Sequence, residues 1–100
     1  MRDELQRQAK LSAALAHPVR LWLLKRLLRG PAIVSALVED LGIEQAAVSK
    51  HLGVLRQARV VRCSPLGRCR DYELIDPAAT RRALNAIEAL VPEQQDEVEQ

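Results

Sequence analysis

The sequence predicts a single, mainly α-helical domain with one small β-hairpin, and three observations support this class. The chain has 100 residues, which is enough for one domain and hardly for two. Apolar residues make up 48% of it and aromatic residues only 2%, so the core must be built from Leu, Val, Ala and Ile, which fill helical interfaces well. The hydrophobic periodicity is helical along most of the chain and becomes alternating only near residues 60–75.

Two helices are predicted in the first third of the chain. The first covers residues 3–16 and ends at His17, because the residue before a proline avoids the helical region. Pro18 suits the first turn of the second helix, where its missing N–H costs nothing. The second helix reads PVRLWLLKRLLRG and is apolar on nearly all sides, which is typical of the central helix of a domain. Gly30 and Pro31 end it.

A third and a fourth helix are predicted to follow, joined by a tight turn. The third covers residues 32–40, with Ile33 and Leu37 packing inward. The turn depends on Gly42, because glycine tolerates a positive φ. The fourth covers residues 44–58. Its buried stripe consists of Val48, Leu52 and Leu55. Two helices joined by a short turn that contains glycine form a helix-turn-helix.

The hairpin and a last helix complete the predicted order. Two short extended runs, at residues 60–64 and 68–75, flank the turn signal PLG and predict a two-stranded hairpin. Asp76 and Pro77 then begin a last helix. A hairpin placed after a helix-turn-helix would be a wing, so the predicted fold is a winged helix-turn-helix with the order α-α-α-α-β-β-α.

Charge is distributed unevenly, although the formal net charge is only +2. One segment carries five arginines and no acid, namely Arg56, Arg59, Arg62, Arg68 and Arg70. Residues 92–100 carry acids and no base. The basic segment indicates a local anion-binding surface, although arginines chosen only for solubility would give the same pattern. We therefore divide the chain into a winged domain at residues 1–91 and an acidic tail at residues 92–100, which we expect to be disordered.

The outer face of the fourth predicted helix lacks the usual pattern of solvating charges. Its members are Gln45, Ala46, Ser49 and Lys50. A helix that enters the major groove of DNA needs small residues for close approach, and amide or hydroxyl groups for base edges. Gln45 can pair with adenine and Ala46 can touch a thymine methyl group, while Ser49 and Lys50 can reach bases or phosphates.

Two further residues of this helix have two readings each. Gly53 lowers the helix propensity by roughly 1 kcal/mol relative to alanine. That cost fits a close approach of DNA or of a neighbouring helix, but also a tolerated surface position. His51 lies at the edge of the buried stripe, where it either bonds a neighbouring residue of the protein or contacts a phosphate.

Three segments together carry a family resemblance. They read LAHPVRLWLLKRLLRGP, LVEDLGIEQAAVSKHLGVLRQARVV and GRCRDYEL, and over about residues 11–76 the chain resembles the ArsR/SmtB family of bacterial repressors. The resemblance implies a homodimer formed through the first and last helices, with an inducer that lowers its affinity for double-stranded DNA. The residues implied to bind DNA are Gln45, Ala46, Ser49, Lys50 and His51 on the recognition helix, and Arg68 and Arg70 on the wing. Arg56 of the basic segment is a further candidate for DNA binding.

The metal sites of that family do not transfer to this sequence. The third predicted helix contains no cysteine and the last contains no histidine. Asp76 and Glu88 alone would make a poor site for a transition metal. We therefore expect no certain cofactor, and the usual inducers of the family are in doubt.

Cys63 and Cys69 are the remaining unusual residues. If PLG is the loop, they face each other across the hairpin with Cβ atoms about 4.5–5.5 Å apart. A disulfide prefers about 3.8 Å, so closing it would need strain, and strained disulfides are the labile, regulatory kind. Neighbouring arginines should raise the thiolate fraction. Three readings remain open, which are small strand residues without a role, a thiol switch, and a site for a thiophilic metal ion such as copper(I).

The leading functional prediction is a sequence-specific transcriptional repressor that binds double-stranded DNA as a homodimer. The alternative is a winged-helix protein-interaction module that does not bind DNA, because fold does not fix function. An enzyme is not expected, since the sequence offers no Ser-His-Asp set, no Gly-rich phosphate loop and no paired carboxylates. The start of the chain has no apolar signal segment, and no run is long enough to span a membrane. We therefore expect a cytoplasmic protein without a membrane partner.

Overall fold

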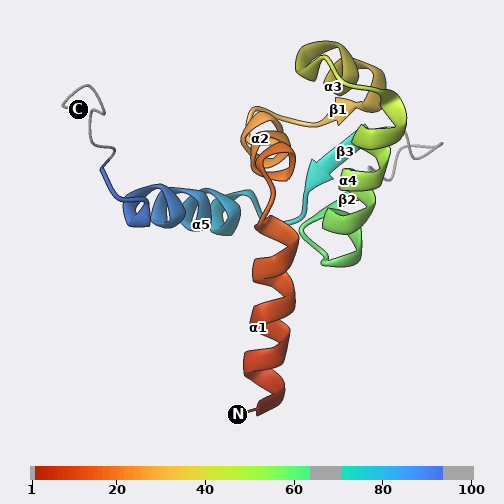
Figure 1. The fold of residues 1–100 in the computed structure, drawn as a ribbon. Helices are drawn as coiled ribbons and strands as arrows, with labels where there is room; N and C mark the ends of the chain where they lie inside the picture. The colour runs from red at the N-terminus through yellow and green to blue at the C-terminus, as the bar shows by residue number, and fades with distance from the viewer. Residues whose placement is uncertain (1, 64–70, 94–100) are drawn as a thin grey trace.

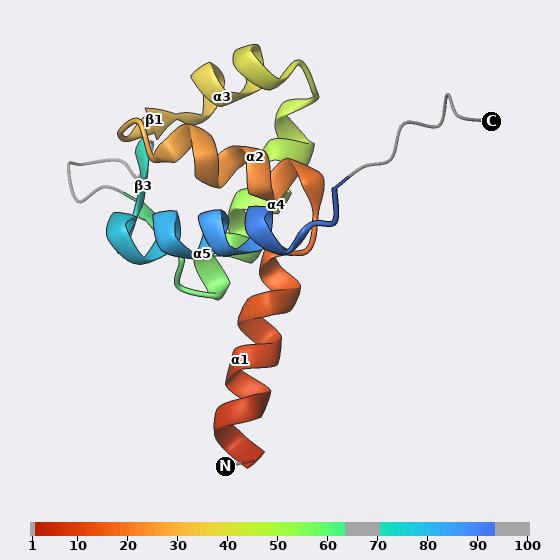
Figure 2. The same cartoon turned by 90° about the vertical axis from the view of Figure 1, so that its left-hand side faces the viewer.

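The computed structural model describes residues 2–63 and 71–93. Its elements, in order, are α1 (Arg2–Leu15), α2 (Pro18–Leu27), β1 (Ala32–Ile33), α3 (Val34–Leu41), α4 (Gln45–Gln57), β2 (Val61–Cys63), β3 (Asp71–Leu74) and α5 (Pro77–Leu90). Helices α2, α3 and α4 gather around a small sheet, whereas α1 projects from this body in both side views (Figures 1 and 2). The predicted mainly helical, winged helix-turn-helix class is confirmed.

Local sequence signals set the helix boundaries. The Nδ1 atom of His17 accepts a hydrogen bond of 3.1 Å from the backbone N–H of Val19 at the start of α2. Asp76 caps α5 in the same way, because its Oδ1 accepts from the N–H of Ala79 at 3.0 Å. Gly42 ends α3 in the left-handed conformation, with a φ of 77°. The turn of the predicted helix-turn-helix is therefore where the glycine placed it.

One core joins the helices to the sheet. Its buried members are Leu23, Leu24, Leu27, Ala32, Leu37, Val48, Leu52, Leu55, Val61, Leu74 and Leu84. Trp22 and Tyr72 are partly buried and pack against this cluster. The core contains no fully buried aromatic side chain in the described part of the chain, as the aliphatic composition predicts.

The start of the third helix was predicted wrongly. Residues 32 and 33 form strand β1 instead of a first helical turn, and Ala32 pairs with Tyr72 of β3. Ile33 was expected to pack inward but is 45% exposed. The extended backbone at this point pairs with the hairpin and adds a third strand, in the order β1-β3-β2. Two residues are too few for a strand pattern to be visible in the sequence.

The register of the hairpin also differs from the prediction. Cys63 lies opposite Tyr72 in the strand register and not opposite residue 69, while Cys69 itself lies outside the described residues. In the observed register Val61 lies opposite Leu74, and both side chains are buried. The predicted three-residue loop would instead have placed Val61 opposite Asp71, a charged residue. Burial of one face therefore selects the register, and the loop signal PLG was a weaker guide.

Candidate nucleic-acid interface

Helix α4 is held from behind by the core. Val48, Leu52 and Leu55 have no exposed surface, as predicted, and α4 contacts α2, α3 and β2. Its first turn begins after Glu44, whose side chain makes no capping hydrogen bond. The helix is thus fixed by its apolar face, which leaves the opposite face to be used for something other than stability.

That opposite face is exposed and carries the side chains expected to read DNA. Its predicted members Gln45, Ala46, Ser49, Lys50 and Arg56 are all exposed. Gly53 lies on the same face, and a Cβ atom placed there would meet no atom within 4 Å. Close packing of a neighbouring helix therefore does not explain the glycine. An open strip along α4 remains that another molecule can approach closely.

His51 bonds a neighbouring residue of the protein. Its Nδ1 atom lies 3.1 Å from Nη1 of Arg20 in α2. An arginine has no acceptor, so Nδ1 of His51 must be the unprotonated nitrogen and accept this hydrogen bond. Arg20 also donates from Nε to the carbonyl oxygen of Ala14 at 2.6 Å. One guanidinium therefore joins the end of α1 to the recognition helix.

The surroundings of His51 favour its neutral form. Burial is the largest cause that lowers its pKa below the usual value of 6.5. The positive charges that lower the pKa further come from His17, Arg20 and Lys50. The ring of His17 lies close, with centroids 4.3 Å apart and planes tilted by 46°. This geometry supports the reading of His51 as a boundary residue more than the reading as a cationic phosphate contact.

A polar groove lies beside the last turns of α4. It has a volume of about 540 Å³ and is lined by Gly53, Arg56, Gln57, Arg59, Val61, Arg62 and Ile75. The sequence shows Arg59 and Arg62 only as members of a basic run and does not indicate that either residue lines a DNA-binding surface. Their position beside Arg56 depends on the turn after α4, which the sequence pattern does not predict.

Part of the predicted site lies outside the described residues. Arg68, Arg70 and Cys69 belong to residues 64–70, and the acidic tail from residue 94 onward is not described either. Cys63 is disulfide-bonded, and no described cysteine is free. Among the described residues, no group of three or more His, Cys, Asp and Glu side chains could hold a metal ion.

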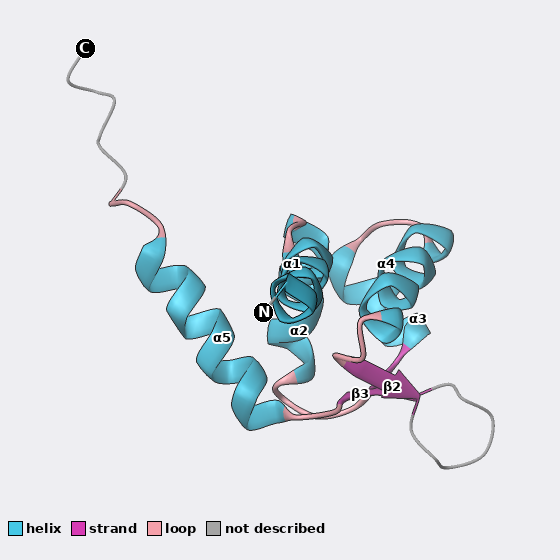
Figure 3. Ribbon diagram, turned by 90° about the horizontal axis from the view of Figure 1, so that it is seen from below, coloured by secondary structure: helices cyan, strands magenta, loops and turns pink. Residues whose placement is uncertain are grey.

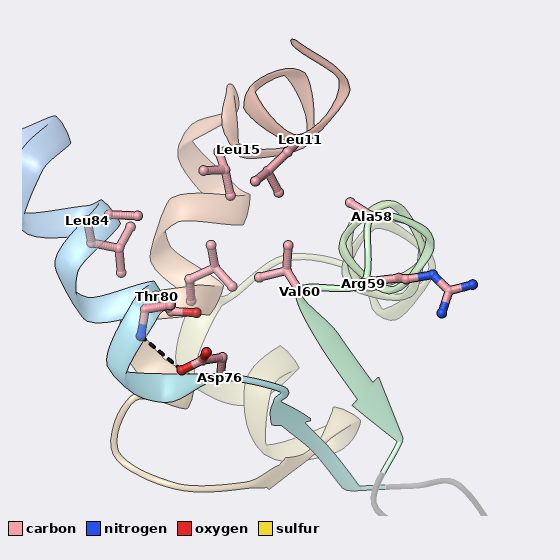
Figure 4. Close-up of a pocket in the computed structure, with 11 residues that line it drawn as sticks. Leu11, Leu15, Ala58, Arg59, Val60, Asp76, Thr80 and Leu84 are labelled. Atoms are coloured by element: carbon pink, nitrogen blue, oxygen red, sulfur yellow. Dashed lines mark hydrogen bonds between the residues drawn. The ribbon is translucent and has the colours of Figure 1, made fainter. Parts of the chain in front are cut away.

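An apolar pocket lies on the side of the molecule where α1 and α5 leave the body (Figure 4). Its volume is about 220 Å³. Leu11 and Leu15 of α1, Val60, and Leu84 of α5 line it. Seen from below, α5 lies to one side of α1 and α2, and the helix-turn-helix and the sheet lie to the other (Figure 3). The apolar pocket and the exposed face of α4 are therefore separate surfaces.

Comparison with known proteins gives a consistent result. The family described as "Bacterial regulatory protein, arsR family" matches residues 17–62. Among curated proteins, the chain is 45% identical over 64 residues to the HTH-type transcriptional regulator Rv2034 of Mycobacterium tuberculosis, covering 64% of this chain and 59% of that protein. It is 46% identical over 63 residues to the regulator NmtR of the same organism, covering 63% of this chain and 52% of that protein. The chain thus spans between half and three fifths of the length of these relatives.

Solved structures extend the similarity to nearly the whole chain. The transcriptional repressor BigR from Xylella fastidiosa is 31% identical with a TM-score of 0.71, covering 94% of this chain and 99% of that one. NolR from Sinorhizobium fredii is 27% identical with a TM-score of 0.77, covering 89% of this chain and 88% of that one. No helix in the described part of the chain is both long and apolar enough to cross a membrane.

Proposed function

Because the chain belongs to the ArsR family of bacterial regulatory proteins, we propose that it is a transcriptional repressor that binds double-stranded DNA as a homodimer. A single observation carries the proposal, which is the division of α4 into two faces. Three leucine and valine side chains fix one face completely, while small, amide and cationic side chains occupy the other. This is the composition that a helix needs in the major groove. Family membership favours this reading over a protein-interaction module and over an enzyme.

Homodimerisation is supported by apolar surface on the two terminal helices. Leu5 and Leu11 of α1 are 56% and 44% exposed, and Leu90 at the end of α5 is 81% exposed. The apolar pocket lies between the same two helices. A domain of 100 residues has a thin core, so covering these side chains with a second copy would stabilise the fold. A dimer would also place two copies of α4 on two half-sites of one operator.

The proposal is tested by fluorescence anisotropy with the DNA upstream of the protein's own gene. Wild-type protein should bind with an affinity that falls steeply as salt concentration rises, because arginines and lysines neutralise phosphates. Gln45→Ala should relax base preference at one position by about 1–3 kcal/mol. Arg56→Gln should weaken all sequences alike. Equal losses on every sequence for both variants would contradict this division of roles, and no binding to any duplex would contradict the proposal itself.

For the control of DNA release we infer a thiol switch at Cys63 and Cys69, with binding of a thiophilic metal ion as the competing proposal. The supporting observation is that Cys63 at the end of β2 is disulfide-bonded, so its sulfur forms such a bond within this fold. Reduced protein should bind the duplex and lose affinity after mild diamide treatment. The double variant Cys63→Ser, Cys69→Ser should not respond. A response of that variant equal to the wild type would refute the switch, and a loss of DNA affinity with copper(I) but not with diamide would favour the metal.

A further inference from the structure

We propose that the polar groove between the end of α4 and β2 is a phosphate-binding site, which holds the sugar-phosphate backbone of one DNA strand through Arg56, Arg59 and Arg62. The inference rests on the proposed DNA binding, and it adds a contact surface beyond the base-reading face of α4. Its ligand is the phosphodiester backbone, so it contributes affinity that does not depend on sequence.

The composition of the groove fits an anion. Among the described residues that line it, three are arginines and none is acidic, although Glu73 pairs with Arg62 beside the groove. The lining also includes Gly53, where no side chain narrows the approach and no other part of the described protein fills the space. Arginine is well suited to phosphate because its planar guanidinium can donate two parallel hydrogen bonds.

Arg59 gives the strongest indication of a role. It has a φ of 64°, the left-handed conformation that helix ends usually assign to glycine. The turn is a full Schellman arrangement, since the N–H of Arg59 donates to the carbonyl of Arg56 at 2.9 Å and the N–H of Val60 donates to that of Leu55 at 3.0 Å. Glycine would make this turn with less strain. The turn places the side chain of Arg59 at the groove, and a role there accounts for an arginine at a position that favours glycine.

The direction of that side chain agrees with the proposal. Arg59 also borders the apolar pocket, but its guanidinium points away from the pocket and past the end of α4 (Figure 4). The carbonyl oxygens of Leu55 and Arg56 at the end of α4 already accept hydrogen bonds within the turn. The positive charge of Arg59 is therefore presented on the side of the turn away from the apolar pocket.

Arg62 is fixed at the other wall of the groove. Its Nε donates to Oε2 of Glu73 at 2.8 Å, and the two residues are partners across the β2–β3 register. The Arg62 side chain remains 56% exposed, so the pair orients the guanidinium without burying it. Strand β2 thus contributes one cation and the end of α4 contributes two.

The position of the groove matches the course of a DNA strand. If the exposed face of α4 enters the major groove and the hairpin contacts the adjacent minor groove, one backbone runs between these two elements. The groove lies at this boundary, between α4 and the first strand of the hairpin. Phosphates of that strand would pass along the three arginines.

The test is Arg59→Gly, which separates stability from binding because it should move them in opposite directions. The melting temperature should rise, since glycine relieves the left-handed strain. The slope of log K against log salt concentration should become shallower by about 0.9, which is the contribution of one phosphate contact. The ratio of wild-type affinity to variant affinity should therefore be roughly eightfold larger at 0.1 M salt than at 1 M salt. The loss should be equal on the upstream duplex and on an unrelated duplex.

Two matched variants control for charge. Arg59→Lys keeps the cation in the groove and should retain the wild-type salt slope. Lys25→Gln removes one charge from an exposed position of α2 and should also retain it. An unchanged salt slope in Arg59→Gly, or an equal change in Lys25→Gln, would overturn the inference while leaving the proposed function intact. A wild-type protein that binds no duplex would overturn both.

Discussion

The exposed face of α4 and the exposed faces of α1 and α5 are both uncovered surfaces, but they differ in what lies behind them. Behind α4 the core is complete, and the exposed side chains are small, amide or charged. On the terminal helices the exposed side chains include Leu5, Leu11 and Leu90, and the space between α1 and α5 is an apolar pocket.

The apolar face of α4 is fully covered within one chain, whereas the apolar side chains of α1 and α5 are not. The apolar stripe of α4 is completely buried against α2, α3 and β2 of the same chain, so α4 is held in position without a second copy. The terminal helices leave apolar surface that water does not favour, and in the proposed dimer a second copy covers it. Recognition and assembly are therefore expected to respond to different substitutions.

The largest change in the free energy of unfolding is expected in the core behind α4. Leu52 of α4 has no exposed surface, so Leu52→Ala should lower the free energy of unfolding by about 2–5 kcal/mol through lost burial and a residual cavity. Urea denaturation measures this directly. Leu90→Ala is the comparison on the other surface, and it should lower the free energy of unfolding by no more than about 0.5 kcal/mol when both variants are measured at protein concentrations low enough to keep the chain monomeric. Similar losses at both positions would break the comparison.

The next effect concerns assembly. Leu11→Glu on α1 and Leu90→Glu on α5 should each prevent dimer formation, because a carboxylate would be buried without a partner. Loss of the second half-site contact should then weaken operator binding by about 100-fold or more. Sedimentation velocity and anisotropy report the two changes.

The control for assembly adds the same charge at a polar position. Gln6→Glu lies at an exposed position of α1 that is turned by about 140° around the helix from Leu11 and should leave the dimer intact. If Leu11→Glu and Leu90→Glu remained dimeric at the wild-type dissociation constant, the terminal helices would not form the interface.

The smallest effect concerns the link between α2 and α4. The pKa of His51 is lowered in the folded protein, so the unfolded chain binds more protons as the pH falls below 6.5. Stability should therefore be complete above that pH and decrease as the pH falls through the lowered pKa. His51→Gln removes this titration while keeping an acceptor for Arg20, and its melting temperature should fall less between pH 7.5 and 5.5. Parallel curves for the two proteins would contradict the lowered pKa of His51.

Most of the fold could be predicted because the signals are local. Pro18, Gly42 and Pro77 mark helix boundaries that the structure confirms within a residue or two. The periodic stripe of α4 identified all three of its buried residues. Strand β1 and the hairpin register could not be predicted, because both depend on pairing with β3 and not on the residues of the segment itself.

The candidate site was predictable in part for the same reason. Periodicity alone places Gln45, Ser49 and Lys50 on the exposed face of α4. The bond between His51 and Arg20 joins residues 31 positions apart, and no pattern within either helix indicates it. The convergence of Arg59 with Arg62 depends on a left-handed residue where the sequence offers no glycine.

Selection of sequences from a random duplex pool by the reduced protein at near-physiological salt tests directly whether α4 reads DNA. We expect enrichment of an inverted repeat whose half-sites are about one helical turn apart, or slightly more. We also expect Gln45→Ala to lose its preference at one base pair of each half-site. Recovery of the pool without any enriched sequence would contradict the assignment of α4 as the element that reads DNA.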